Sequence, residues 1–234
     1  VGWDATYNGR GWMMSRRDTR PTETNVTTWA YDLDGNRTEE TDALGKTEFY
    51  HYDDRNRRTT IIDRLGGITQ FAYDAVGNLT RISDADNESR GALAHVEGCT
   101  QYAYDPRNLL VAEAFPAGQA GRTLRAYAYD AGRRLIQRRV GILSGAFSAA
   151  PAFATAPEVT DYAYDGHDRL ITRSYAAGSA DVFAYDAAGR LRTARSGRYG
   201  TEVARNYDLV GRLIEEALCL SPGCTAAGCT QRVG

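Results

Sequence analysis

Residues 73–80 read Tyr73-Asp74-Ala75-Val76-Gly77-Asn78-Leu79-Thr80, and this stretch decides the fold because variants of it recur along the chain. The pair Tyr-Asp occurs eight times, with successive spacings of 21, 21, 31, 25, 35, 21 and 22 residues. A repeat of about 21 residues with three insertions is the signature of a repeat protein. We therefore expect one small structural unit to be copied along most of the chain.

Each copy places a strand-like segment before the Tyr-Asp pair and a turn-forming residue three positions after the Asp. A carboxylate repeated once per unit is explained most simply as a turn cap that accepts backbone N–H groups. The repeat-defining residues, which we expect to be structural, are Tyr31, Asp32, Gly35, Tyr52, Asp53, Tyr73, Asp74, Gly77, Tyr104, Asp105, Tyr129, Asp130, Tyr164, Asp165, Tyr185, Asp186, Gly189, Tyr207, Asp208 and Gly211.

Four copies lack the glycine of this motif. Asn56, Asn108, Arg133 and Asp168 stand in its place. Asn and Asp tolerate left-handed backbone better than other non-glycine residues, so most of this drift keeps the turn chemistry. Residues 7–11, Tyr-Asn-Gly-Arg-Gly, form a degenerate ninth copy at the start of the chain.

The residues before each Tyr-Asp pair alternate in character, as in 69–73 and 181–185, and period two is strand geometry. A second turn signal at 42–45 and 63–66 closes the unit. The fold class that we expect is all-β, with antiparallel hairpins of about 21 residues repeated to form a curved or spiralling sheet, a partial YD shell. The pairing register is left open, because a slip of one residue would invert the faces.

An aromatic residue stands two positions before most of the repeat tyrosines. Aromatic residues two apart share one face of a strand and can stack on their equivalents in the next repeat, so we expect an aromatic ladder. The same rings could instead bind sugars. These aromatic residues are Trp29, Tyr50, Phe71, Tyr102, Tyr127, Tyr162 and Phe183.

The expected domain organisation is a repeat array over residues 1–214 followed by a Cys- and Gly-containing tail or cap over 215–234. Insertions near 84–100 and 141–158 have the composition of surface loops, and loops of this length are often functional. The insertion at 116–121 resembles a plain turn extension.

The composition is that of a globular domain, with 42% hydrophobic and 25% charged residues and a net charge of -2. This balance argues against nucleic acid as a partner, and no polybasic run suggests an anionic membrane. No segment approaches the about 18 apolar residues of a membrane-spanning helix. We expect no nucleic-acid partner and no membrane span.

Candidate chemistry is weak, and we expect no catalytic, cofactor-binding or metal-binding residues. The segment 32–36 has alternating oxygen ligands but does not match the spacing of a calcium loop. The acidic stretch 84–88 could hold a cation loosely. His95, Glu97 and Cys99 could be metal ligands or a Cys-His pair, but the sequence shows no second group of residues that would complete such a site. His51 and His167 lie at repeat positions and are expected on the surface.

Three of the four cysteines, Cys219, Cys224 and Cys229, cluster in the last residues of the chain, with Cys99 far upstream. Their spacing does not match common zinc sites. Disulfides are expected if the protein is exported, and free thiols if it stays in a reducing compartment.

The units Tyr-Asp-x-x-Gly-Arg-Leu-Ile and Phe-Ala-Tyr-Asp-x-x-Gly-Asn-Leu-Thr, with Asp-Ala-Leu-Gly between them, resemble the Rhs or YD repeats of bacterial polymorphic toxins. Related repeats occur in the BC components of insecticidal Tc toxins, in wall-associated bacterial proteins and in the animal teneurins. The resemblance covers residues 7–214. The chain departs from the family pattern in having only eight or nine repeats and no Asp-Pro-x-Gly core motif or toxin domain.

This resemblance implies a non-enzymatic structural module of an exported bacterial protein, secreted or at the cell surface, that encloses a toxin or acts as a scaffold. The implied partners are further repeats of a longer chain, or self-association through sheet edges, and a toxin cargo domain. Carbohydrate binding by exposed aromatic residues, with glycans as partners, is the alternative. An enzyme with a site in an insertion is a third hypothesis, and no cofactor is expected.

Overall fold

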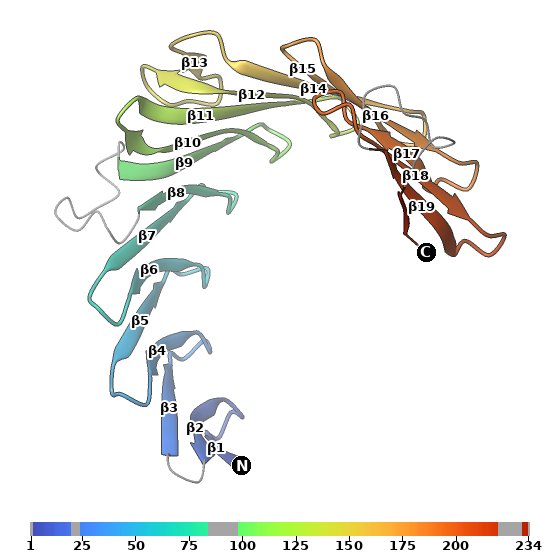
Figure 1. The fold of residues 1–234 in the computed structure, drawn as a ribbon. Coiled ribbons are helices and arrows are strands. Elements are labelled where there is room, and N and C mark those ends of the chain that lie inside the picture. Colours follow the sequence, from blue (N-terminus) through green and yellow to red (C-terminus); the bar gives the residue numbers. More distant parts are fainter. Residues whose placement is uncertain (1, 20–23, 84–97, 220–230, 234) are drawn as a thin grey trace. The chain divides into compact units, whose positions relative to one another are not determined.

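The computed structural model describes residues 2–19, 24–83, 98–219 and 231–233, and these residues are almost entirely β-strand and turn (Figure 1). The predicted all-β fold of repeated antiparallel hairpins is confirmed. The strands are β1 (Gly2–Tyr7), β2 (Met13–Thr19), β3 (Thr24–Tyr31), β4 (Arg37–Thr41), β5 (Thr47–Tyr52), β6 (Arg58–Ile62), β7 (Ile68–Tyr73), β8 (Leu79–Ser83), β9 (Cys99–Tyr104), β10 (Leu110–Gly118), β11 (Gly121–Tyr129), β12 (Leu135–Ser144), β13 (Ala152–Phe153), β14 (Glu158–Tyr164), β15 (Leu170–Tyr175), β16 (Ala180–Tyr185), β17 (Leu191–Arg195), β18 (Glu202–Tyr207), β19 (Leu213–Cys219) and β20 (Gln231–Val233).

The chain divides into two compact units. The first consists of 1–108 with 113–122, and the second of 109–112 with 123–234. Both units are built from the same antiparallel hairpin, so one description of the repeat serves for each.

The tyrosine of each Tyr-Asp pair is the last residue of the first strand of a hairpin. In the hairpin β7–β8, Phe71 pairs with Ile82 and Ala72 with Arg81, and the register then shifts so that Tyr73 pairs with Leu79. The same shift occurs at the equivalent tyrosine of β1–β2, β3–β4, β5–β6, β11–β12, β14–β15, β16–β17 and β18–β19. Such a bulge raises the local twist and fixes which residues face each other. The register that the sequence left open is therefore set at the tyrosine.

The turn after each tyrosine has a constant hydrogen-bond pattern. The Asp74 N–H donates to the carbonyl of Asn78 at 2.9 Å, and the Gly77 N–H donates to the carbonyl of Asp74 at 3.2 Å. Gly77 has a φ of 111°, the left-handed region in which glycine carries no steric cost. A tight turn followed by a left-handed residue is a common way to close a short hairpin loop.

The four residues that replace the turn glycine adopt the same left-handed backbone. Their φ values are 60° for Asn56, 61° for Asn108, 67° for Arg133 and 62° for Asp168. The prediction that these substitutions preserve the turn is confirmed for the backbone conformation. The degenerate first copy has the same turn, because Gly11 has a φ of 80° and its N–H donates to the carbonyl of Asn8 at 3.0 Å.

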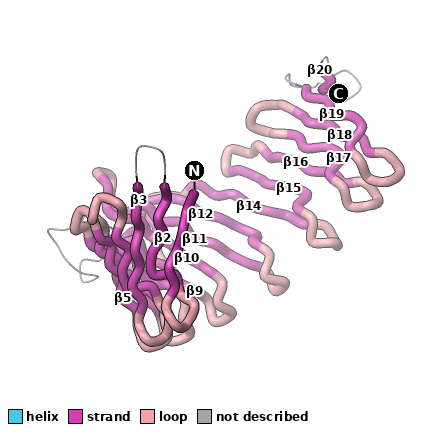
Figure 2. The backbone as a smooth tube through the Cα atoms, turned by 90° about the horizontal axis from the view of Figure 1, so that it is seen from below, coloured by secondary structure: helices cyan, strands magenta, loops and turns pink. Residues whose placement is uncertain are grey.

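The opposite ends of the strands carry the predicted second turn, and loops lie at both ends of the strands (Figure 2). The Asp42 N–H donates to the Lys46 carbonyl, and the Gly45 N–H donates to the Asp42 carbonyl. The same pattern recurs from Asp63 to Gly67. Hairpin therefore follows hairpin within the first unit, as in β4–β5 and β6–β7.

One insertion folds differently from its predicted loop. The segment 141–158 begins as a continuation of β12, and β13 then pairs back onto Leu143 and Ser144. A Cβ added to Gly141 would lie 2.9 Å from the Phe153 ring, so this glycine admits the added strand. The segment 116–121 contains the end of β10, a turn at 119–120 and the start of β11. Most of the insertion near 84–100 lies outside the described residues.

Few side chains of this sheet are buried by a second layer of structure. The surface measures 14739 Å², whereas a compact protein of this mass exposes about 10,400 Å². Most strand side chains are half-buried, and the few fully buried ones include Leu124 and Thr160. The hairpins must therefore be held together mainly by contacts along the sheet, since little second layer covers them.

The left-handed turn position gives a test of the backbone requirement at Gly189, whose φ is 83° and whose added Cβ would make only ordinary contact with Arg169. We expect Gly189→Val to lower the free energy of unfolding by roughly 2 kcal/mol, because a β-branched residue is strained there. Gly189→Asn should cost less than about 1 kcal/mol. Urea denaturation of both variants checks this, and equal losses would contradict it.

Candidate functional site

The carboxylates of the Tyr-Asp pairs are bound within their own turns. Asp53 is typical: its Oδ1 accepts the N–H groups of Arg55 at 2.9 Å and Arg57 at 3.0 Å, and its Oδ2 accepts from the Arg57 guanidinium at 2.8 Å. Backbone N–H groups that the turn would leave unpaired thus find an acceptor. Carboxylates with the equivalent acceptor role are Asp32, Asp74, Asp165, Asp186 and Asp208.

Asp105 and Asp130 also accept bonds from their own turns, from Arg107 and Arg134 respectively. In the first copy, Asn8 substitutes for the acid, and its Oδ1 accepts the N–H groups of Arg10 and Trp12 at 3.0 Å. An amide oxygen therefore suffices for the backbone part of the cap. The second carboxylate oxygen adds a bond to a side chain of the turn, two residues on at Asp105 and four residues on at Asp130.

These bonds change the acidity of the turn carboxylates. The hydrogen bond from the Arg57 side chain is the largest cause that lowers the pKa of Asp53 from 3.8 to about 2. The Arg169 side chain does the same for Asp165, whose pKa is also lowered from 3.8 to about 2. A carboxyl group with such a low pKa stays ionised at neutral pH, which suits a permanent cap and not a general acid.

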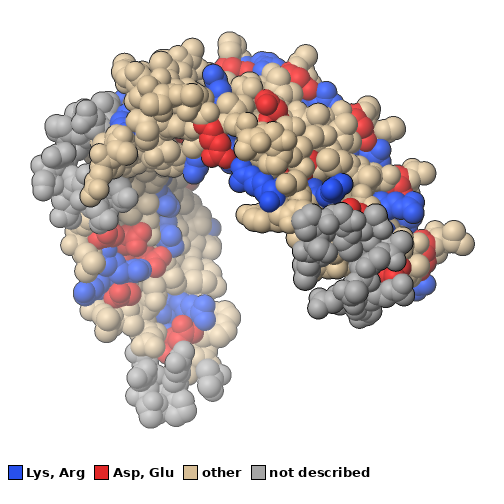
Figure 3. All heavy atoms as spheres, turned by 45° about the horizontal axis from the view of Figure 1, so that its top comes forward, with Lys and Arg blue, Asp and Glu red and all other residues tan. Residues whose placement is uncertain are grey.

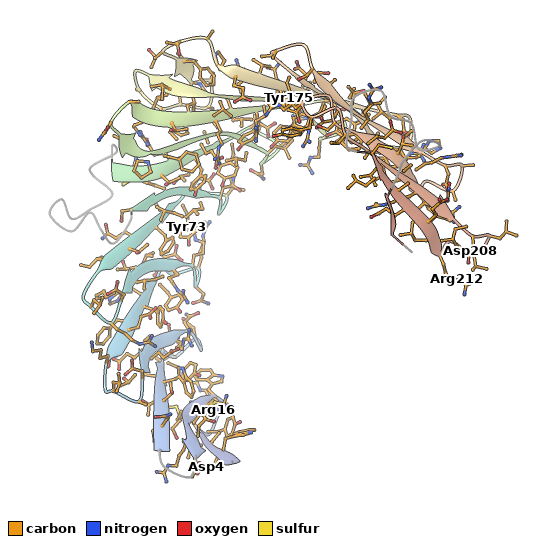
Figure 4. All side chains as sticks on the ribbon, in the orientation of Figure 1. Asp4, Arg16, Tyr73, Tyr175, Asp208 and Arg212 are labelled. Carbon is orange, nitrogen blue, oxygen red and sulfur yellow. The ribbon has the colours of Figure 1, made fainter. Side chains whose placement is uncertain are left out.

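The tyrosine hydroxyl of each pair reaches back to the preceding hairpin. The acceptor is the backbone carbonyl of the first residue in the second strand of that hairpin, as when Tyr73 donates to Arg58 at 2.9 Å. All eight tyrosines make this bond, at 2.8 to 3.0 Å, and Figure 4 labels Tyr73 among them. The other pairs are Tyr31 to Met13, Tyr52 to Arg37, Tyr104 to Leu79, Tyr129 to Leu110, Tyr164 to Leu135, Tyr185 to Leu170 and Tyr207 to Leu191.

The tyrosine ring is covered by the turn of the preceding hairpin. The residue after the left-handed position lies over it: the Arg57 guanidinium carbon is 4.5 Å from the Tyr73 ring centre, and that of Arg190 is 4.7 Å from the ring of Tyr207. Arg134 and Arg169 lie in the same way over Tyr164 and Tyr185. In the first copy the covering group is Trp12, with 5.4 Å between its ring centre and that of Tyr31.

At four of these junctions a guanidinium therefore covers the repeat tyrosine, and at Tyr31 a tryptophan ring does. The predicted ladder of the aromatic residues two positions upstream stays a prediction. Tyr50, two positions before Tyr52, is buried between Arg37 and Arg58, which lie 5.0 and 4.5 Å from its ring centre. Rings covered in this way offer no free face to a sugar. Carbohydrate binding stays a hypothesis that glycan-array measurements would test.

Sequence reasoning missed two ionic clusters near the second turns. Asp181 is 5% exposed, and its Oδ2 accepts from the Tyr175 hydroxyl at 2.6 Å and the Arg173 Nε at 3.0 Å. Its Oδ1 accepts the Gly197 N–H at 3.1 Å, and a Cβ on that glycine would lie 2.2 Å from the Ala180 carbonyl oxygen. The sequence did contain a sign of this cluster. Asp181 lies four residues before a repeat tyrosine, at the position where other copies have Thr69, Thr100 or Thr160.

The second cluster is centred on Glu40 in the first unit. Its Oε2 accepts from Trp29 Nε1 at 3.1 Å and Arg37 at 2.7 Å, and its Oε1 accepts from Arg64 at 2.7 Å. Arg64 also lies 3.4 Å from Asp42. On the face visible in Figure 3, positive and negative side chains lie next to one another in this manner. Both clusters join neighbouring hairpins, and their charged groups pair with one another within the sheet.

The described residues contain no group of three or more His, Cys, Asp or Glu side chains that could hold a metal ion. His95, Glu97 and the acidic stretch 84–88 lie outside them, so their hypotheses stay untested. Cys99 is a buried thiol, and burial raises its pKa. Cys219 is disulfide-bonded.

His51 and His167 are exposed, as expected for surface positions of the repeat. No helix among the described residues is long and apolar enough to span a membrane.

The sequence matches the family model RHS Repeat at residues 52–89 and 164–202. The chain therefore contains RHS repeats at these two places. Both matched segments begin at a repeat tyrosine, Tyr52 in the first unit and Tyr164 in the second. The predicted resemblance to Rhs or YD repeats is confirmed, and the chain is a structural Rhs-repeat module. No curated protein matches the sequence.

Among solved structures, TcdB2-TccC3-TEV matches with a TM-score of 0.47 and 14% identity over 92% of this chain. A Photorhabdus luminescens Tc holotoxin pore structure matches with a TM-score of 0.45 and 13% identity, also over 92%. This chain spans 14% of the length of each of those toxin chains. A porin-like protein from Bacteroides uniformis matches with a TM-score of 0.27 and 12% identity, over 92% of this chain and 86% of its own.

The hydroxyl bond between hairpins can be tested at Tyr73. We expect Tyr73→Phe to lower the free energy of unfolding by about 1 kcal/mol, because the Arg58 carbonyl loses its donor while the ring stays under Arg57. Urea denaturation measures the loss. Tyr199→Phe is the matched control, since Tyr199 is 75% exposed. Equal effects of the two changes would contradict the role of the bond.

The lowered acidity of the turn carboxylates predicts a pH dependence. A group whose pKa falls on folding stabilises the fold above its unfolded pKa, and that contribution is lost as the pH drops through the folded value. For Asp53 and Asp165 the window runs from 3.8 down to about 2. We expect the urea midpoint to fall steeply over this window. Asp53→Asn should flatten the fall, whereas Asp54→Asn, at the exposed neighbour, should not.

Proposed function

We propose that this chain is a non-enzymatic wall segment of an exported Rhs-repeat protein, whose sheet encloses a toxin cargo domain. The observation that carries the proposal is the use of the repeated polar groups within the fold. The eight tyrosine hydroxyls bond to the preceding hairpins, and the turn carboxylates bond to their own turns, so these groups serve the sheet and not a substrate.

A wall requires each unit to be joined firmly to the next with no second layer behind it. At one end of the strands, each repeat tyrosine joins its hairpin to the preceding one. Its hydroxyl donates to a backbone carbonyl, and an arginine guanidinium can lie over its ring, as at Tyr185. The Asp181 and Glu40 clusters join them near the other end. Most strand side chains are half-buried and few are fully buried, which fits a wall that faces solvent on one side and cargo on the other.

Export is supported by the chemistry of Cys219. Disulfide bonds persist in oxidising compartments and are rare in the reducing cytosol. A disulfide at Cys219, at the end of β19, therefore fits a protein that works outside the cytoplasm. An extracellular scaffold without cargo would have the same disulfide, so the cargo needs its own test.

The test uses the natural full-length protein that contains this chain. If the repeat sheet encloses a cargo, brief proteolysis of the native protein should leave the cargo segment intact, and the same protease should digest it after the sheet is opened by urea. Mass spectrometry of the surviving fragments reads this out. A scaffold without cargo would show equal digestion of every segment outside the repeats before and after urea, and this result would overturn the proposal.

A further inference from the structure

The tyrosine junctions all use the same groups, so these groups cannot distinguish one hairpin from another. Each repeat tyrosine donates to the first carbonyl in the second strand of the preceding hairpin. A hairpin that docked onto the hairpin before its proper neighbour, with the neighbour looped out, would still form this bond. Misassembly of this kind is a known failure of repeat proteins. The order of the hairpins must therefore be selected by other contacts.

The left-handed residue of a turn contacts the preceding turn. In the first unit, Asn36 Nδ2 donates to Asn56 Oδ1 at 2.7 Å, and Asn78 Nδ2 donates to Asn108 Oδ1 at 3.1 Å. The acceptors are two of the residues that replace the turn glycine, and the donors directly follow the left-handed position of the turn before. These two asparagines therefore join turn to turn in addition to tolerating the left-handed backbone.

The second unit contains the same contact with charged groups. Arg134 Nη1 donates to Asp168 Oδ1 at 2.6 Å, and Asp168 has a φ of 62°. Arg134 is also the residue that lies over the ring of Tyr164. In all three contacts an oxygen acceptor stands at the left-handed position, where the preceding turn offers an N–H donor.

Glycine occupies the left-handed position where the preceding turn presents a different group. A Cβ added to Gly35 would lie 2.8 Å from Cζ2 of Trp12, which is too close for a rigid ring. At Gly77 the preceding Arg57 donates through Nη1 to the backbone carbonyl of Asp74 at 3.2 Å and needs no side-chain acceptor. The residue at the left-handed position is thus matched to the group that covers it.

Two wrong arrangements in the first unit would break this match. If β5–β6 docked onto β1–β2, Asn56 would take the place of Gly35, and its Cβ would meet the Trp12 ring. If β7–β8 docked onto β3–β4, Gly77 would take the place of Asn56, and the Asn36 amide would lose its acceptor. The tyrosine bond would form in both arrangements. The left-handed residue therefore separates the correct order from these alternatives.

We propose that the residue at the left-handed turn position selects the hairpin that precedes it, so that Gly35, Asn56, Asn108 and Asp168 fix the order of the hairpins. Specificity between similar partners is a difference of affinities, to which both favourable bonds and clashes contribute. Here the three acceptors supply bonds, and Trp12 supplies a clash with any residue larger than glycine. The inference does not depend on the proposed wall function, because any sheet of similar hairpins requires a defined order.

The bond between Asn36 and Asn56 is tested by a double-mutant cycle in urea denaturation. Glycine carries no steric cost at a φ of 60°, so a residue that served only the backbone could be replaced by it without loss. We expect Asn56→Gly to raise the unfolding equilibrium constant about threefold, because one hydrogen bond is lost. In a chain with Asn36→Ala the same change should cause no increase. Equal effects in the two backgrounds would overturn the proposal.

The clash with Trp12 is tested by placing the same residue at two equivalent turns. A Cβ added to Gly189 would lie 3.5 Å from Nη1 of Arg169, the end of a flexible side chain, so Gly189→Asn is the matched control for Gly35→Asn. We expect Gly35→Asn to raise the unfolding equilibrium constant at least tenfold more than Gly189→Asn, because overpacking against a rigid ring is costly. Trp12→Ala should remove this difference. A difference that persists without Trp12 would contradict the clash.

The order itself is tested with a disulfide that forms only in a wrong arrangement. Ser15 of β2 pairs with Thr28, which stands three residues before Tyr31. Phe49 stands three residues before Tyr52, so it would lie opposite Ser15 if β5–β6 docked onto β1–β2. The full chain with Ser15→Cys and Phe49→Cys is unfolded in urea with reductant, refolded and then oxidised, and mass spectrometry measures the 15–49 disulfide. Ser15→Cys with Thr28→Cys reports the native order under the same conditions.

The expected yields follow from the match at Asn56. With Asn56 in place, the 15–28 disulfide should form and the 15–49 disulfide should be rare. Asn56→Gly removes the side chain that would meet Trp12, so it should raise the 15–49 yield several-fold. Asn108→Gly is the control, because Asn108 does not meet Trp12 in this wrong arrangement. A 15–49 yield that Asn56→Gly leaves unchanged, or that Asn108→Gly raises equally, would overturn the proposal.

Discussion

The hydrogen bond from a tyrosine hydroxyl to a carbonyl of the preceding hairpin is the interaction on which this sheet depends. A single hairpin is marginally stable in water, and a layer with both faces accessible gains little from burial. The chain must therefore stabilise each hairpin through its neighbour. The tyrosine does this with both of its parts, because the hydroxyl bonds to the backbone and the ring packs under a side chain of the same neighbouring turn.

The turn supplies the geometry that this bond requires. A left-handed residue and a bulge fix where the second strand begins, and the first residue of that strand carries the acceptor carbonyl. The aspartate holds the turn through backbone N–H groups, and its second oxygen orients the arginine that covers the next ring. Tyr, Asp and Gly thus act as one unit that is completed only by the following hairpin.

Much of the fold follows from local sequence. The left-handed backbone at Asn56 and Asp168 could be predicted from their position in the motif, since few residue types tolerate it. The strand β13 could not, because it depends on a pairing with the end of β12 and on the space that Gly141 leaves for Phe153. The guanidinium cover of Tyr73 and Tyr185 could not be predicted either, for a related reason. Spacing places rings on one face but does not say whether a ring or a guanidinium covers them.

The sequence by itself determined the repeat, the turns and the alternation of strands, because period, turn residues and left-handed positions act over a few neighbouring residues. Only the tertiary structure decided which carbonyl each tyrosine reaches, since the acceptors lie 15 to 29 residues away along the chain. It also decided that Asp181 and Glu40 become the centres of ionic clusters. These contacts exist only after one hairpin has been placed beside the next, and register, not local preference, selects them.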